Sequence, residues 1–163
     1  MAELTPLDEK LGEVLGLAQA AQAATDTVRR MEGADAFAGD LDEMRTQAEQ
    51  TEQRTAALVD TLEGRKTAIR EKARETKSEA SEMMKTYLSG EEEALDGFEF
   101  LSMAEAGELC HWEIVQRIAS AAGESQASEL AGWAVDVQRA HVSAVRDAYL
   151  ALASEEAKEM ASA

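Results

Sequence analysis

A glutamate and a histidine three residues apart, Glu108 and His111, are the side chains of this chain whose types and spacing most directly suggest chemistry. Residues three apart on an α-helix project side by side from adjacent turns. At about 100° per residue, both fall near the middle of a stripe that is otherwise apolar. A Glu-x-x-His pair pointing into a helical bundle is the arrangement that di-iron and di-manganese carboxylate proteins use. The apolar members of this stripe are Leu101, Ala104, Trp112, Val115, Ile118 and Ala122.

Two further polar residues fall on the inward faces of other expected helices. Glu52 lies within the apolar stripe of a helix expected over residues 40–62, and His141 lies near the centre of the stripe expected over residues 128–154. Counted from the loops at about 1.5 Å per residue, these residues and Glu108 lie near the middle of the bundle. Carboxylate and imidazole ligands suit Fe, Mn or Zn ions. We therefore predict a metal site formed by Glu52, Glu108, His111 and His141, with Glu49 and Gln138 as secondary candidates.

The alternative is a layer of polar side chains that hydrogen bond to one another. A histidine on an apolar helix face is more often a satisfied core residue than a ligand. A hydrogen bond between Glu108 and His141 across the core would satisfy both side chains. The protein would then be a non-catalytic structural or partner-binding helical bundle whose metal site has been lost.

Composition predicts an all-α protein. The 163 residues include one proline and 4% aromatic residues, and Ala, Glu, Leu and Arg are abundant. This composition is typical of long helices rather than strands, and the length fits one domain over residues 1–163. Thr5 is expected to cap a first helix that has Pro6 at its first position.

The order of the expected helices predicts an antiparallel four-helix bundle with one long crossover. The short loop at residues 33–39 implies that the first two helices are antiparallel neighbours. Residues 64–92 are rich in cations and have a poor apolar stripe, so we expect a partly helical crossover between the second and third helices. Packing of five helices is the alternative. The third helix is expected to end at Gly123, before the fourth.

Charge and cysteine content exclude several functional classes. The net charge of −17 at pH 7 is expected to repel nucleic acid and anionic membranes. The single cysteine, Cys110, excludes an internal disulfide framework and fits a reducing compartment. No apolar run is long enough to span a bilayer, and the first ten residues carry acids where a signal peptide would carry lysines. We therefore expect a cytoplasmic protein with no nucleic-acid or membrane partner.

With these residues identified, the chain resembles the ferritin-like superfamily, and most closely its YciF-like stress-response branch. The similar stretches are Glu49-Gln50-Thr51-Glu52 and His111-Trp112-Glu113-Ile114, together with a third helix that ends in glycine. The resemblance implies a four-helix bundle that binds Fe, Mn or Zn, often forms dimers and acts in oxidative or general stress. It also favours position 110 and Glu113 as a ligand pair, whereas the apolar stripe favours Glu108 and His111.

The chain departs from the family pattern at three places. Cys110 stands where the family has a carboxylate, Gln138 stands where it typically has glutamate, and the first helix has no central acid. A full di-iron centre needs about four carboxylates and two histidines. These departures leave open a mononuclear site, a changed metal or a lost site.

The positions of the large aromatic residues predict a homodimer. Phe98, Trp112 and Trp133 do not all fit one narrow core stripe, and Phe98 with Leu109 forms a second apolar strip on the third helix. An exposed apolar strip of this kind is typical of an interface between subunits. We therefore expect two copies of the chain to bury one of these strips.

Overall fold

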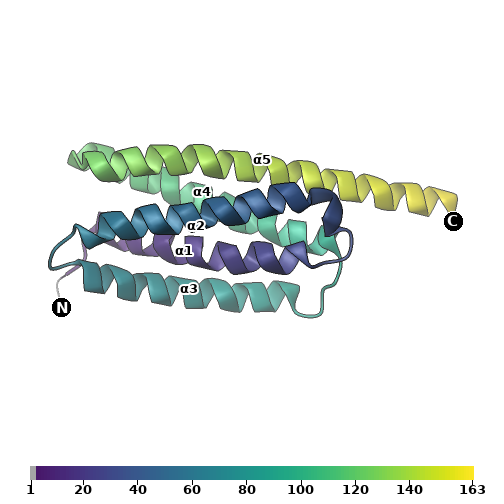
Figure 1. Ribbon diagram of the computed structural model, residues 1–163, viewed down its shortest axis with the longest axis horizontal. Coiled ribbons are helices and arrows are strands. Elements are labelled where there is room, and N and C mark those ends of the chain that lie inside the picture. Colours follow the sequence, from purple (N-terminus) through teal and green to yellow (C-terminus); the bar gives the residue numbers. More distant parts are fainter. Residues whose placement is uncertain (1–2) are drawn as a thin grey trace.

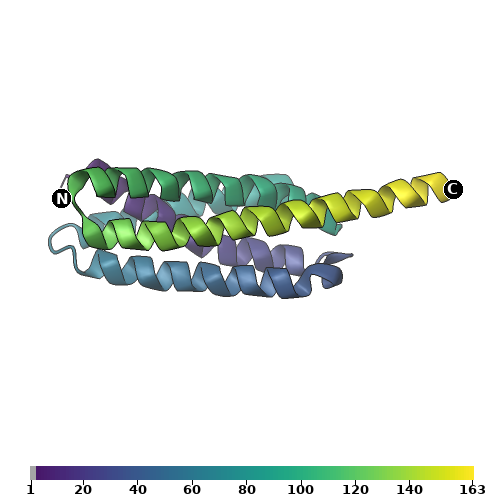
Figure 2. The same ribbon diagram turned by 90° about the horizontal axis from the view of Figure 1, so that it is seen from above.

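The computed structural model describes residues 3–163, which fold into five long α-helices and one short 3-10 helix, without a β-strand. The helices are α1 (Pro6–Arg29), η1 (Ala34–Phe37), α2 (Ala38–Asp60), α3 (Lys66–Leu88), α4 (Ala94–Ala122) and α5 (Ser125–Ser162). The long helices lie side by side, and α5 extends beyond the others toward the C-terminus (Figures 1 and 2). The all-α prediction is confirmed. None of the helices within residues 3–163 is long and apolar enough to cross a membrane.

Four of the helices pack in a ring, and the fifth lies outside it. Helix α1 packs against α2 and α4, and α5 packs against the same two helices. Helix α3 packs mainly along α1 (Figure 1). The sequence predicted a partly helical crossover over residues 64–92, but α3 occupies most of that segment as one continuous helix.

Small residues explain why α3 folds against α1 without a broad apolar stripe. A methyl group added at Gly16 would lie 2.4 Å from the carbonyl oxygen of Ala73, and one added at Gly12 would lie 2.9 Å from the carbonyl oxygen of Ile69. The two glycines are one helical turn apart, so they form a flat strip on which the α3 backbone lies close to α1. This interface depends on close backbone approach rather than on large side chains, and most of the buried residues of α3 are accordingly small (Ala68, Ala73 and Thr76).

Thr5 caps the N-terminus of α1, as predicted, and it does so as part of a capping box with Asp8. The Thr5 Oγ1 atom accepts a hydrogen bond from the Asp8 backbone N–H at 3.2 Å, and the Asp8 carboxylate accepts one from the Thr5 N–H at 3.0 Å. The buried Asp8 carboxylate also accepts a hydrogen bond from Arg65 at 3.0 Å. The cap therefore also holds the start of α3 against α1.

The apolar core is divided into two clusters by polar residues. One cluster lies at the α1–α2 loop end and contains Val28, Leu41, Met44, Phe98, Leu101 and Val145 among others. The other lies at the opposite end and contains Leu11, Val14, Val59, Trp112, Val115 and Ala134 among others. On α4 and α5, the residues between the two clusters are buried glutamate, glutamine and histidine.

The large aromatic residues do not form the exposed strip from which a homodimer was predicted. Phe98 is buried and packs edge-on against Phe37, with ring centroids 5.2 Å apart. Trp112 is fully buried, and the guanidinium of Arg54 covers the Trp133 ring at 4.0 Å. Phe98 is therefore covered within the same chain, because η1 folds back and supplies Phe37.

Candidate functional site: a buried polar layer

Four polar side chains fill the middle of the bundle between the two apolar clusters. Glu105 and Glu108 come from successive turns of α4, and Gln138 and His141 come from successive turns of α5. None of the four is more than 4% exposed. Buried polar groups in such a position need partners, because an unpaired buried group costs about 1–3 kcal/mol and an unpaired charge costs more.

His141 uses both of its ring nitrogens within the layer. Its Nδ1 atom lies 2.9 Å from Oε2 of Glu105, and its Nε2 atom lies 2.6 Å from Oε1 of Gln47 on α2. The side-chain amide of Gln47 donates to Glu43 at 3.1 Å, so the Gln47 oxygen faces His141. A carbonyl oxygen only accepts hydrogen bonds, so the Nε2 atom of His141 carries a proton.

A second proton must therefore lie between His141 and Glu105. Either the ring is an imidazolium beside a carboxylate, or a neutral ring accepts from a protonated Glu105. The pair has zero net charge in both arrangements. This neutrality is what allows an imidazole and a carboxyl group to lie in the core without a further counter-ion.

Glu108 is held by a different partner. The amide nitrogen of Gln138 donates to Oε2 of Glu108 at 2.9 Å. Burial raises the pKa of Glu108 well above its ordinary value, and the negative charge of nearby Glu105 raises it further. Glu108 therefore keeps its proton to a higher pH than a glutamate in water does, which limits the charge that the layer must hold.

Two buried atoms near the layer have no hydrogen-bond partner among residues 3–163. They are the indole Nε1 of Trp112, a donor, and Oε1 of Gln138, an acceptor. Trp112 follows Glu108 by one turn of α4. Within the layer, both nitrogens of His141 are thus bonded, whereas Gln138 keeps an unpaired acceptor.

The structure does not bring the four predicted metal ligands together. Glu108 and His141 lie in the layer, but each is bonded to a different neighbour. Glu52 is half-buried between α1 and α2, where Gln19 and Gln22 donate to its two oxygens at 3.1 and 2.6 Å. Within residues 3–163, no three His, Cys, Asp or Glu side chains are grouped so that they could hold a metal ion.

His111 also lies outside the layer. Its Nδ1 atom is 2.7 Å from the Gly107 carbonyl oxygen, and its Nε2 atom is 3.4 Å from Oε2 of Glu13 on α1. The sequence placed His111 near the centre of the buried stripe. The buried face of α4 is instead rotated toward Glu105, which leaves the side chain of His111 33% exposed.

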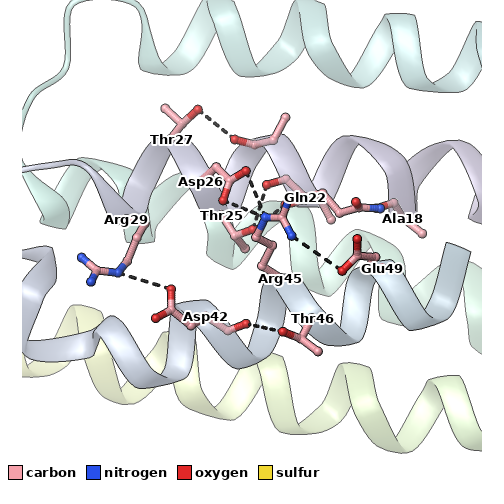
Figure 3. A network of polar contacts seen from close by, with 12 residues as sticks. Ala18, Gln22, Thr25, Asp26, Thr27, Arg29, Asp42, Arg45, Thr46 and Glu49 are labelled. Atoms are coloured by element: carbon pink, nitrogen blue, oxygen red, sulfur yellow. Dashed lines mark hydrogen bonds and ion pairs between the residues drawn. The ribbon is translucent and has the colours of Figure 1, made fainter.

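Of the less favoured ligand candidates Gln138, Glu113 and Glu49, only Gln138 lies in the layer. Gln138 belongs to the layer, whereas Glu113 forms an exposed ion pair with Arg139 at 3.3 Å. Glu49 lies 3.7 Å from the Arg45 guanidinium, which also pairs with Asp26 (Figure 3). These three residues lie on the exposed surface where α1 meets α2, which we call the α1–α2 seam. Cys110 is exposed.

The sequence reasoning missed Glu105 of the layer and also Gln47, the α2 residue that bonds to His141. The signal for Glu105 was present, since the alternating four- and three-residue spacing of a buried helix face links Leu101, Glu105, Glu108, Trp112 and Val115. No comparable signal exists for Gln47. It is only partly buried, and its role depends on the distance between α2 and α5.

Comparisons of the chain with family models, with curated proteins and with solved structures gave no match.

Proposed function

We propose that this protein is a non-catalytic helical bundle with a structural or partner-binding role, in which the central polar layer hydrogen bonds to itself instead of holding a metal ion. The observation that carries this proposal is the use of both His141 nitrogens by Glu105 and Gln47. A metal ligand needs a free lone pair on nitrogen, so coordination would require His141 to release one of these partners.

The packing of the helices supports a ferritin-like scaffold beneath that layer. Helices α1, α2, α4 and α5 form the ring, and α3 runs back along the outside of α1. As a result, α4 begins at the end of the bundle where α2 begins (Figure 1). Two hairpins joined by one long crossover are the topology of ferritin-like bundles. Under this proposal, α3 is a helical version of that crossover.

Metal binding is the second candidate function. The observation that favours it is that Glu105, Glu108 and His141 lie in one layer, with both carboxyl groups on successive turns of α4. Two carboxylates and one imidazole are donors that suit Fe, Mn or Zn. Such a site would use Glu105 in place of the predicted Glu52 and His111. The three side chains are not grouped as metal ligands in the structure, so the site would require them to leave their present partners, converge and lose the protons that the layer now holds.

The two histidines of the chain give a matched test of these functions. Thermal melts of the wild type, His141→Ala and His111→Ala should be recorded with a chelator and with Mn²⁺, Fe²⁺ or Zn²⁺, on protein made without a histidine tag. We expect no metal-dependent shift in the wild type, and we expect His141→Ala to lose stability equally with and without metal. His111→Ala should be close to wild type, because its side chain is partly exposed.

Metal binding predicts a different pattern. An occupied site adds about 2.7 kcal/mol of stability when free metal is 100-fold above its dissociation constant. The wild type and His111→Ala would then melt at a higher temperature with metal, and His141→Ala would not. Elemental analysis of protein purified without chelators provides an independent measurement.

A further inference from the structure

An apolar cavity lies on the other side of Glu108 from the polar layer. It has a volume of about 240 Å³ and is enclosed by α1, α3 and α4. Most of its wall is aliphatic, with Leu17, Ala21 and Ala24 contributed by α1 and Met84 by α3. Helix α3 touches α1 closely at Gly12 and Gly16, but beyond them the α1 alanines are too short to fill the space between the helices.

Glu108 is the buried polar group in this wall, and it retains a free hydrogen-bonding position. Its Oε2 atom is bonded to Gln138, and its Oε1 atom has no bonded partner among residues 3–163. Of the other two polar residues of the wall, Ser81 donates to the Lys77 carbonyl oxygen, and His111 bonds through Nδ1 to the Gly107 carbonyl oxygen while its Nε2 atom lies 3.4 Å from the Glu13 carboxylate. Glu108 as a whole residue is only 3% exposed, and it lines the cavity.

The mouth of the cavity is apolar and partly open. Met83 of α3 and Met103 of α4 line the cavity and are 57% and 50% exposed. Phe100 also lines it and lies against the exposed Tyr87, with ring centroids 6.1 Å apart. Methionine side chains are flexible, so they adapt to occupants of different shape.

Charge selects among ligands that have an apolar body and one polar end. The chain carries a net charge of −17, which attracts cations and repels anions. In its ionised form, the carboxyl group at the base of the cavity forms a charge-assisted hydrogen bond with an ammonium group and repels a carboxylate. A neutral alcohol would find an acceptor but no compensating charge.

We propose that this cavity binds a small alkyl amine, with its ammonium group on Oε1 of Glu108 and its hydrocarbon chain between α1, α3 and α4. The inference goes beyond the structural role proposed above and does not depend on it. Binding leaves the Gln138 hydrogen bond to Oε2 in place, so an occupied cavity and an intact polar layer coexist.

Binding of the amine is linked to the proton on Glu108. The ammonium ion stabilises the carboxylate, so each bound ligand displaces the Glu108 proton to solvent. The charged or titratable groups around this carboxyl are Glu105 and His111 on α4 and, through Glu105, His141 on α5, while the cavity residues of α1 and α3 do not titrate. Because burial and Glu105 raise the pKa of Glu108, affinity for the amine should increase with pH until that pKa is passed.

The probes for the test are n-octylamine, 1-octanol and octanoate, which share one chain length and differ in charge. Isothermal titration calorimetry of the wild type at about pH 6 and pH 8 should give at least roughly tenfold tighter binding of octylamine than of octanol, with octanoate weakest. Octylamine should bind more tightly at the higher pH. Equal affinity for the three probes, or no binding of octylamine, would overturn the proposal.

Three variants locate the site. Glu108→Gln keeps the shape of the side chain and should abolish the preference for the amine over the alcohol. Glu99→Gln makes the same charge change at an exposed position of α4 and should keep that preference. Ala20→Leu extends a cavity-lining side chain into the space and should weaken all three probes. An unchanged amine preference in Glu108→Gln, or unchanged affinity in Ala20→Leu, would place the binding elsewhere and contradict the proposal.

Discussion

Two polar networks in this bundle have similar contact distances and different surroundings. The Nδ1 atom of His141 lies 2.9 Å from Oε2 of Glu105, and the Nε atom of Arg45 lies 2.9 Å from Oδ1 of Asp26. The first pair has side chains that are 4% and 2% exposed, whereas both side chains of the second are 41% exposed (Figure 3). The contact distance alone therefore says little about what each pair contributes.

Access to water separates the two networks energetically. On the α1–α2 seam, water replaces any partner that is lost, so exposed ion pairs contribute little and are screened by salt. In the central layer, a side chain that loses its partner remains in a medium of low dielectric constant. We therefore expect substitutions to have large effects on stability in the layer and small effects on the seam, and four measurements test this expectation.

The largest effect is expected when one member of the buried pair is removed. Glu105→Leu leaves the His141 ring without its carboxylate and should reduce the free energy of unfolding by about 3–5 kcal/mol. The double variant Glu105→Leu/His141→Leu should recover most of that loss, since Gln47 is partly exposed and can bond to water. Urea denaturation measures both. A double variant as unstable as the sum of the two single variants would contradict this account of the pair.

A pH-dependent effect is expected at Glu108. Its pKa is raised in the folded protein, so its contribution to stability is fully present below the unfolded pKa of about 4.3 and is lost as pH rises through the folded pKa. The wild type should therefore lose stability relative to Glu108→Gln across this window, by at most about 1.4 kcal/mol per pH unit. Urea midpoints at a series of pH values test this. Glu99→Gln serves as the control, and a constant difference between wild type and Glu108→Gln would count against the raised pKa.

A smaller effect is expected at Glu52, which is intermediate between the two networks. Its carboxylate accepts hydrogen bonds from Gln19 and Gln22 but is only half-buried. Glu52→Ala should cost about 1 kcal/mol, because water can reach the two amides. The loss should be the same with Mn²⁺, Zn²⁺ or a chelator. A metal-dependent loss would return Glu52 to the set of ligands that the sequence predicted.

The smallest effect is expected on the exposed seam. The hydrogen bond and charge of Asp26 raise the pKa of Arg45, so this guanidinium stays charged at every pH at which the protein would be studied. Arg45→Gln should change the urea midpoint by no more than the scatter between replicates, and about 1 M NaCl should remove any difference that remains. A change as large as that of Glu105→Leu would show that exposure does not separate the two networks.

The sequence by itself determined much of the bundle. Hydrophobic spacing, the Thr5-Pro6 cap and the loop glycines placed α1, α2, α4 and α5 to within a few residues of their ends, apart from the start of α4 and the C-terminal extension of α5. The same spacing placed Glu108, Gln138 and His141 inside the bundle and near its middle. These properties are local, because they depend on which residues share one face of one helix.

The tertiary structure decided which polar side chains meet. The spacing of apolar residues located the buried face of α4 only to within about one residue. A rotation of that size decides whether His111 or Glu105 lies on the buried face. The spacing also carried no information on the approach of α3, which depends on the absence of side chains at Gly12 and Gly16. Hydrogen bonds require atoms within a few tenths of an ångström of an ideal distance. The pairing of His141 with Glu105 and Gln47, rather than with a metal or with Glu108, was therefore settled only when the rotation and spacing of three helices were fixed together.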